Sequence, residues 1–175
     1  MKIAVIGDFH IPSRVRKIPE KIKKKLKEES PEIIICTGDI GNKKTLKELQ
    51  KIAKTKTVKG NTDKENFPRK IQLEKKGIKI TALHGDQIFP RGNKDRLRYI
   101  AEQEDTDILI HGHTHQLDIE KIKEKLFVNP GTATGAWSGG GSNPKPSFIT
   151  IEINQKIKIK KIKEDKTEIK TYEFN

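Results

Sequence analysis

The chain of 175 residues is long enough for one domain with a sizeable core and too short for two domains of ordinary size. Its 37 Lys and Arg residues against 24 Asp and Glu give a formal net charge of +13. Much of the lysine alternates with isoleucine or glutamate, a pattern that fits a heat-adapted proteome better than a nucleic-acid-binding surface. The single cysteine, Cys36, excludes an internal disulfide, and no apolar run approaches the roughly 20 residues that span a bilayer. We therefore expect a soluble cytoplasmic protein for which nucleic acid is a less favoured partner.

Six short β-rich runs alternate with stretches of helical spacing, which predicts one α/β domain over residues 1–175. The first two runs are nearly continuously apolar, as expected of strands that are covered on both faces. The predicted strands are Ile3–Ile6, Ile33–Cys36, Thr57–Lys59, Lys79–Leu83, Ile108–Ile110 and Leu126–Val128.

Three amphipathic helices are predicted between these strands from apolar residues that recur every three or four positions. The first helix is expected to tolerate Pro19 in its first turn. Asn42 is predicted to cap the second helix, and either Gly92 or Asn93 to begin the third.

The pattern changes from helical spacing to alternation after Pro146 and continues to Phe174. Alternation predicts antiparallel strands, with lysines on the wet face or on an edge where they block sheet-to-sheet association. The preceding segment, from Gly135 to Pro146, holds four glycines and two prolines around Trp137 and is predicted to be a mobile surface loop.

Five of the apolar runs are followed directly by residues that bind metals. In open α/β sheets, ligands bind beyond the carboxyl ends of the strands, so these residues are expected to converge. Any one of them alone would more often be a turn, a cap or a buried histidine. Together they would be costly to bury without a cation. The segments are Gly7-Asp8-Phe9-His10, Gly38-Asp39, Gly60-Asn61-Thr62-Asp63, His84-Gly85-Asp86 and Gly112-His113-Thr114-His115.

Mixed carboxylate, amide and imidazole ligands suit Mn²⁺, Fe²⁺, Co²⁺ or Zn²⁺ better than Ca²⁺, which prefers oxygen alone. A set of seven ligands of these types, four of them histidines, is enough for two ions when one carboxylate bridges them. The Ser and Thr residues have no paired His and Asp in a suggestive order, which argues against a hydrolytic triad.

The order and strand-end placement of these motifs resemble the calcineurin-like metallophosphoesterases over most of the chain. The similarity is closer to a small branch that holds archaeal and bacterial phosphodiesterases of this length and the metallophosphoesterase-like subunit of the retromer sorting complex. The residues behind that closer resemblance are Gly7-Asp8-Phe9-His10-Ile11-Pro12, Cys36-Thr37-Gly38-Asp39 and the run from Asn129 to Ala136.

The resemblance implies a four-layer α/β/β/α sandwich of the metallo-dependent phosphatase type. It also implies two divalent ions, Mn²⁺ in the first place, with Ni²⁺, Co²⁺, Zn²⁺ or Fe²⁺ as alternatives. Asp39 would bridge the two ions. The other expected ligands are Asp8, His10 and His115 for one ion, and Asn61, His84 and His113 for the second.

The activity implied is hydrolysis of a small or nucleotide-like phosphodiester by a metal-bridging hydroxide, with Asp39, Asn61, Asp63 and His84 as catalytic residues. Many family members carry a histidine where Thr62 stands, and that histidine is thought to protonate the leaving group. Its absence predicts a preference for good leaving groups or a substitute acid, either Asp63 or Asp86.

The same resemblance implies an alternative, a protein-interaction scaffold like the retromer subunit, with weak or no catalysis and a protein partner. The intact Asp39 favours the hydrolase, because this position is often asparagine in retromer subunits. His111 is expected to orient a ligand or substrate oxygen, and Asp86 to fix the tautomer of a neighbouring imidazole. Candidate substrate contacts are Arg14, Arg16 and Trp137.

Overall fold

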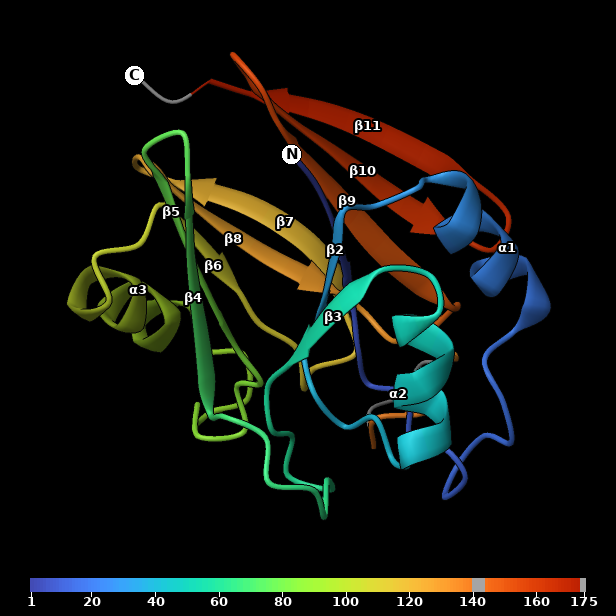
Figure 1. The fold of residues 1–175 in the computed structure, drawn as a ribbon. Helices are drawn as coiled ribbons and strands as arrows, with labels where there is room; N and C mark the ends of the chain where they lie inside the picture. The colour runs from blue at the N-terminus through green and yellow to red at the C-terminus, as the bar shows by residue number, and fades with distance from the viewer. Residues whose placement is uncertain (140–143, 174–175) are drawn as a thin grey trace.

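The computed structural model describes residues 1–139 and 144–173. Within these ranges the chain forms two mixed β-sheets and three helices (Figure 1). The helices are α1 (Glu20–Glu28), α2 (Lys43–Gln50) and α3 (Lys94–Gln103). The strands are β1 (Lys2–Ile6), β2 (Ile33–Cys36), β3 (Lys54–Thr57), β4 (Lys70–Lys75), β5 (Ile78–Leu83), β6 (Ile108–Ile110), β7 (Leu117–Ile122), β8 (Lys125–Pro130), β9 (Ser147–Ile153), β10 (Ile157–Lys163) and β11 (Thr167–Tyr172).

The two sheets each contain a parallel centre, and this feature positions the site. The first sheet has the order β11-β10-β9-β1-β2-β3, in which β1, β2 and β3 are parallel. The second has the order β4-β5-β6-β8-β7, in which β5, β6 and β8 are parallel. The carboxyl ends of parallel neighbours lie at one edge of a sheet, so the loops that follow β1, β2, β3, β5 and β6 can meet.

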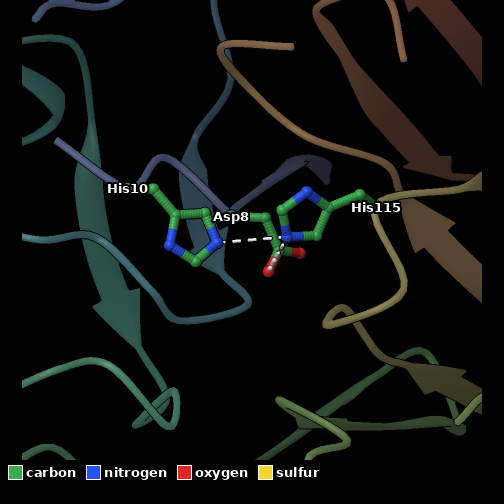
Figure 2. A group of neighbouring side chains, drawn as sticks. All are labelled: Asp8, His10 and His115. Carbon is green, nitrogen blue, oxygen red and sulfur yellow. Dashed lines mark hydrogen bonds and ion pairs between the residues drawn. The ribbon is translucent and has the colours of Figure 1, made fainter. Parts of the chain in front are cut away.

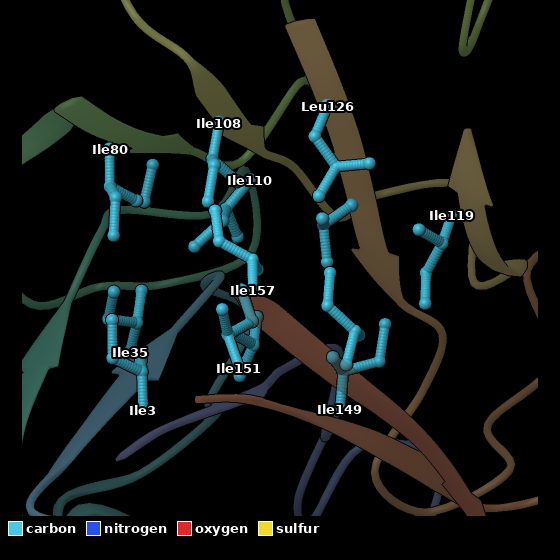
Figure 3. Close-up of a cluster of buried hydrophobic side chains, with 14 of the residues drawn as sticks. Ile3, Ile35, Ile80, Ile108, Ile110, Ile119, Leu126, Ile149, Ile151 and Ile157 are labelled. Carbon is cyan, nitrogen blue, oxygen red and sulfur yellow. The ribbon is translucent and has the colours of Figure 1, made fainter. Parts of the chain in front are cut away.

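The main core lies between the sheets, where isoleucines of both inner faces interdigitate (Figure 3). Ile3 and Ile35 come from the first sheet, and Ile80 and Ile108 from the second. A second cluster packs α1 and α2 against the outer face of the first sheet, through Ile22, Leu26 and Leu49 among others. A third packs α3 against the outer face of the second sheet. The predicted four-layer sandwich is therefore confirmed.

The predicted strands at residues 33–36 and 108–110 have the same bounds in the structure. The third predicted strand is displaced, since β3 ends at Thr57, where its parallel partner β2 also ends at Cys36. Two strands were missed, the edge strands β4 and β7. Each alternates a few apolar residues with polar ones and turns tightly into an antiparallel partner through residues with left-handed backbone, Lys76 and Gly77 after β4 and Lys123 after β7.

The side chain of Asn42 caps α2 by accepting from the Thr45 amide, as predicted. The start of α3 is settled in favour of Asn93, which accepts from the Arg96 amide. Pro19 precedes the first turn of α1 and does not lie within it. The antiparallel strands predicted after Pro146 are confirmed as β9, β10 and β11.

Residues 140–143 of the predicted surface loop, and Phe174 at the end of the alternating segment, lie outside the described residues. None of the helices in the described ranges has the length and apolar character that crossing a membrane requires.

Candidate metal centre

All seven predicted ligands lie in loops at the carboxyl ends of parallel strands, where the two sheets meet. Each ligand lies only a few residues after the end of its strand, so the rigid parallel strands fix the backbone positions of these side chains. Asp8 and His10 follow β1, Asp39 follows β2, Asn61 follows β3, His84 follows β5, and His113 and His115 follow β6.

Asp8, His10 and His115 form one half of the centre and are all buried (Figure 2). The Nε2 atoms of His10 and His115 lie 3.1 Å apart. Nε2 of His115 also lies 3.4 Å from Oδ1 of Asp8. Three potential metal-ligand atoms therefore face one point, although the loops after β1 and β6 that carry them are over 100 residues apart in sequence.

Asp39 connects this half to the second. Its Oδ2 lies 3.4 Å from Nε2 of His10 and 3.6 Å from Nε2 of His84. Nε2 of His84 in turn lies 3.0 Å from Oδ1 of Asn61 and 3.2 Å from Nδ1 of His113. The seven side chains thus form one continuous cluster, with the Asp39 carboxylate between its halves.

Hydrogen bonds to backbone carbonyls fix the tautomers of two of these imidazoles. Nδ1 of His84 lies 2.7 Å from the Thr37 carbonyl, and Nδ1 of His115 lies 2.6 Å from the Ala136 carbonyl. A carbonyl only accepts, so each Nδ1 carries the proton and each Nε2 turns a lone pair into the cluster. The expectation that Asp86 would fix a tautomer is wrong for these rings, because backbone carbonyls do so.

The cluster is short of donors. Among the described residues, Oδ1 of Asp8 is buried and accepts no hydrogen bond. The Nε2 lone pairs of His84 and His115 face Oδ2 of Asp39 and Oδ1 of Asp8, and such a concentration of acceptors is costly in a buried site. Divalent cations resolve that cost, and the mixture of imidazole, carboxylate and amide atoms suits a borderline transition-metal ion. The residues present therefore fit a metal.

Burial sets the protonation states that metal binding needs. It lowers the pKa of His10 and of His113 to about 4, so both rings are neutral and able to bind a metal near pH 7. Burial, helped by the nearby charge of Asp39, raises the pKa of Asp8 well above its ordinary value. A cation would oppose that rise by favouring the carboxylate.

The backbone at the centre is strained. Non-glycine residues rarely adopt positive φ, and each instance costs of the order of 1–3 kcal/mol. Five predicted ligands adopt it, with φ values of 50–68°: Asp8, His10, Asp39, His113 and His115. Gly60 permits the close approach of the loops, because a Cβ there would lie 2.1 Å from Oδ1 of Asp39.

Asp63 lies beside the cluster and organises the loop that carries Asp39. Its Oδ2 accepts from the amides of Asp39 and Gly60 at 2.8 and 2.9 Å, and its Oδ1 from those of Ile40 and Gly41 at 2.8 and 3.2 Å. Because both carboxylate oxygens already accept from backbone amides, the geometry favours a positioning role over proton donation. Asp86, the other predicted acid, pairs with the exposed Arg69 at 3.3 Å.

The run from Asn129 to Ala136 supports the loop after β1. The Thr132 hydroxyl donates to the Asp8 carbonyl at 2.8 Å, and the Thr134 hydroxyl donates to the Phe9 carbonyl at 2.9 Å. This support follows from the fold and has no signal in the local sequence.

Two arginines flank the cluster. Arg14, predicted as a substrate contact, donates to the carbonyl of Trp137. Burial, helped by the charge of Arg14, lowers the pKa of His10 and of His115. Arg91 was missed by sequence reasoning. It donates to the Ser138 carbonyl at 2.8 Å. Beside the larger effect of burial, its positive charge contributes a lowering of the pKa of Asp8, His113 and His115. Arg16 is exposed, as is Trp137 at 55%.

A four-layer sandwich with imidazoles and carboxylates gathered where its two sheets meet defines the class of metallo-dependent phosphatase-like proteins. The chain belongs to the calcineurin-like phosphoesterase superfamily, because the model of that superfamily domain matches residues 1–156. A probable metallophosphoesterase of Methanocaldococcus jannaschii is 35% identical over 162 residues, which cover 93% of this chain and 81% of that protein.

Solved structures of Vps29, the retromer subunit, are also similar. Vps29 of Entamoeba histolytica in complex with Zn²⁺ is 34% identical over the full length of both chains, with a TM-score of 0.90. Vps29 of Chaetomium thermophilum in complex with a cyclic peptide is 28% identical, with a TM-score of 0.84, and the match covers 100% of this chain and 98% of that one. The predicted resemblance to this branch is confirmed.

The geometry predicts different results for two histidines of the same loop. If the centre binds two ions, as the sequence predicts, His115→Asn should lower the bound metal to one ion per chain, because it removes an Nε2 that faces the cluster. His111→Asn should leave two ions, because Nδ1 of His111 contacts Asn129 and not the cluster. Titration calorimetry with Mn²⁺ measures both, and equal losses in the two variants would contradict the ligand assignment.

Proposed function

We propose that this protein is a divalent-metal-dependent phosphodiesterase with a dinuclear centre. The observation that carries the proposal is the convergence of buried lone pairs and carboxylates from both sheets on one small volume. Asp8, His10 and His115 would hold one ion, and Asn61, His84 and His113 the other. Asp39 would bridge them. Mn²⁺ is the proposed ion, with Ni²⁺, Co²⁺, Zn²⁺ or Fe²⁺ as alternatives.

Two ions held by these residues would supply a hydroxide nucleophile near neutral pH and positive charge for the phosphoryl oxygens. The protein contributes orientation and charge. Backbone carbonyls hold the His84 and His115 rings so that their Nε2 atoms face inward. Arg14 and Arg91, each anchored by a backbone carbonyl, place positive charge beside the cluster and attract an anionic substrate.

The leaving group determines which diesters are cleaved well. Thr62 stands where many relatives carry the expected general acid, and its hydroxyl has an ordinary alcohol's weak acidity. The Asp63 carboxylate accepts hydrogen bonds from four backbone amides, which favours a positioning role over proton donation. We therefore propose that the enzyme prefers diesters whose leaving group needs no proton, such as aryl phosphates.

A protein-interaction scaffold is the second candidate. It is favoured by the similarity to Vps29 structures, one of which holds a cyclic peptide. The intact cluster argues against a scaffold without catalysis, because all seven polar side chains face one another and five of them sit on strained backbone. A scaffold would gain nothing from that strain.

Hydrolysis of bis(p-nitrophenyl) phosphate by metal-stripped protein tests the proposal, with Mn²⁺, Ni²⁺, Co²⁺, Zn²⁺ or Mg²⁺ restored separately. We expect turnover of the diester only when metal is present, and slower turnover of p-nitrophenyl phosphate, the monoester. Absence of turnover with every metal, although calorimetry shows two bound ions, would favour the scaffold.

A further inference from the structure

A cavity of about 480 Å³ adjoins the metal centre on the outer face of the second sheet. It lies between the first half of α3, which contributes Lys94 and Leu97, and the β7–β8 hairpin, which contributes Ile122 and Phe127. Its size is that of a small-molecule site. None of the groups proposed to bind metal lines it, so it is a separate space with its own chemistry.

One end of the cavity is connected to the metal centre through shared backbone. Thr114 lines the cavity and lies between the proposed ligands His113 and His115. The amide nitrogen of the buried Asn129 donates to the Gly112 carbonyl at 3.2 Å and to the Thr114 hydroxyl oxygen at 2.9 Å. Arg91, whose charge acts on the metal centre, lines this cavity as well. The cavity and the metal centre therefore lie beside the same short segment, residues 112–115, with Arg91 near both.

This inner end offers hydrogen-bond donors. Asn129 keeps its orientation, because Oδ1 accepts from the Gly131 amide at 3.0 Å and Nδ2 donates to a carbonyl. Nδ2 also lies 3.2 Å from Nδ1 of His111, which places this imidazole beside Asn129 at the inner end of the cavity. His111 is 8% exposed and lines the cavity. The inner end therefore suits the oxygens of an anionic or hydroxylated group.

The outer end of the cavity combines apolar side chains with two carboxylates, which accept hydrogen bonds. In the β7–β8 register Asp118 is opposite Asn129 and Glu120 is opposite Phe127, so these acidic side chains share the face of the hairpin that lines the cavity. Leu97, Ile122 and Phe127 supply apolar surface. Lys94 forms an ion pair with Glu120 at 2.7 Å. Among the described residues, Asp118 forms no ion pair with a lysine or an arginine, and its Oδ1 accepts from the Ile119 amide. A flat apolar group that carries N–H donors fits this end.

We propose that this cavity binds one ester arm of the phosphodiester substrate, and that this arm is a nucleoside. The sugar oxygens would face His111 and Thr114, and the base would lie against Phe127 with its N–H groups toward Asp118. The proposal rests on the proposed diesterase function for its orientation, since the phosphate must sit at the metals. The cavity itself is independent of catalysis.

Two diesters with the same leaving group separate the cavity from the chemistry. Thymidine 5′-(p-nitrophenyl phosphate) and methyl p-nitrophenyl phosphate both release p-nitrophenolate, and they differ only in the arm that stays on phosphorus. For the wild type we expect kcat/KM to favour the thymidine ester by roughly tenfold or more. Ile122→Trp fills the cavity and should reduce that ratio by about tenfold, chiefly through KM of the thymidine ester.

Ile169→Trp is the matched control. Ile169 also lies on an edge strand, β11 of the other sheet, and is 56% exposed, so the same substitution there should leave the ratio unchanged. Metal content and the methyl ester rate should be unaltered in both variants. An equal preference for the two diesters in the wild type, or an equal change in both tryptophan variants, would overturn the proposal.

Calorimetric binding of thymidine 5′-monophosphate to the metal-loaded protein distinguishes failure of the cavity from failure of catalysis. Binding that weakens about tenfold in Ile122→Trp alone would support the cavity even if no diester is hydrolysed. Failure to bind, or equal binding by both tryptophan variants, would refute the cavity whatever the diesterase assay shows.

Discussion

Asp39→Asn is expected to abolish the proposed metal-dependent diesterase activity while leaving the metal-free protein as stable as the wild type. Oδ2 of Asp39 lies within 3.6 Å of both His10 and His84, between the two halves of the cluster. In the proposed centre Asp39 would be the anion between two cations, so without its charge metal affinity and kcat/KM should each fall by roughly 100-fold or more.

The stability expectation follows from the lone pairs. Oδ1 of Asp39 accepts from the Thr62 amide at 2.9 Å, and an asparagine oxygen can do the same. The asparagine NH₂ group would then face the Nε2 lone pair of His84, which lies 3.6 Å from Oδ2 of Asp39. Urea unfolding in chelator should show no loss of stability. Metal-dependent turnover within tenfold of the wild type would show that Asp39 does not bridge.

Asp63→Ala is expected to destabilise the protein by about 3–5 kcal/mol, even without metal. Asp63 is 7% exposed, and its carboxylate accepts four backbone amides of the Asp39 and Gly60 segments. Alanine would leave these donors without partners in a mostly buried place. Urea unfolding of the chelator-treated protein measures the loss directly and separates it from any effect on metal binding.

Asp86→Ala provides the comparison, since both aspartates were predicted as substitute acids. Asp86 pairs with Arg69, whose side chain is 72% exposed, and an exposed pair of this kind is worth about 0–1 kcal/mol. A loss below about 1 kcal/mol for both variants would show that the Asp63 amide contacts carry little free energy. Activity that falls only for Asp86→Ala would return Asp86 to consideration as the acid.

The parts of the fold that the sequence predicted well are those in which both faces of an element are constrained. β2 and β6 are apolar throughout because sheets and helices cover both of their faces, so even their bounds were readable. β4 and β7 are edge strands, and their mixed composition matches that of an exposed loop. Only pairing with β5 and β8 makes them strands.

The candidate site shows the same division. Asp8, His10, Asp39, His113 and His115 were predicted from their position after apolar runs, because strand ends are recognisable locally. The backbone contacts of Asp63 were not predicted, since the four amides that donate to it come from segments that the fold brings together. Arg91 had no signal, because its distance to the cluster depends on where α3 begins.

The sequence by itself therefore determined the class of the fold, the strand-end donors and their fit to divalent metal ions, because periodicity and residue type are local properties. The tertiary structure decided which lone pairs face inward, which carboxylate is tied to the backbone, and that a cavity opens beside the centre. Those features depend on contacts between residues up to about a hundred positions apart, such as the 3.1 Å approach of His10 to His115, and no local pattern encodes them.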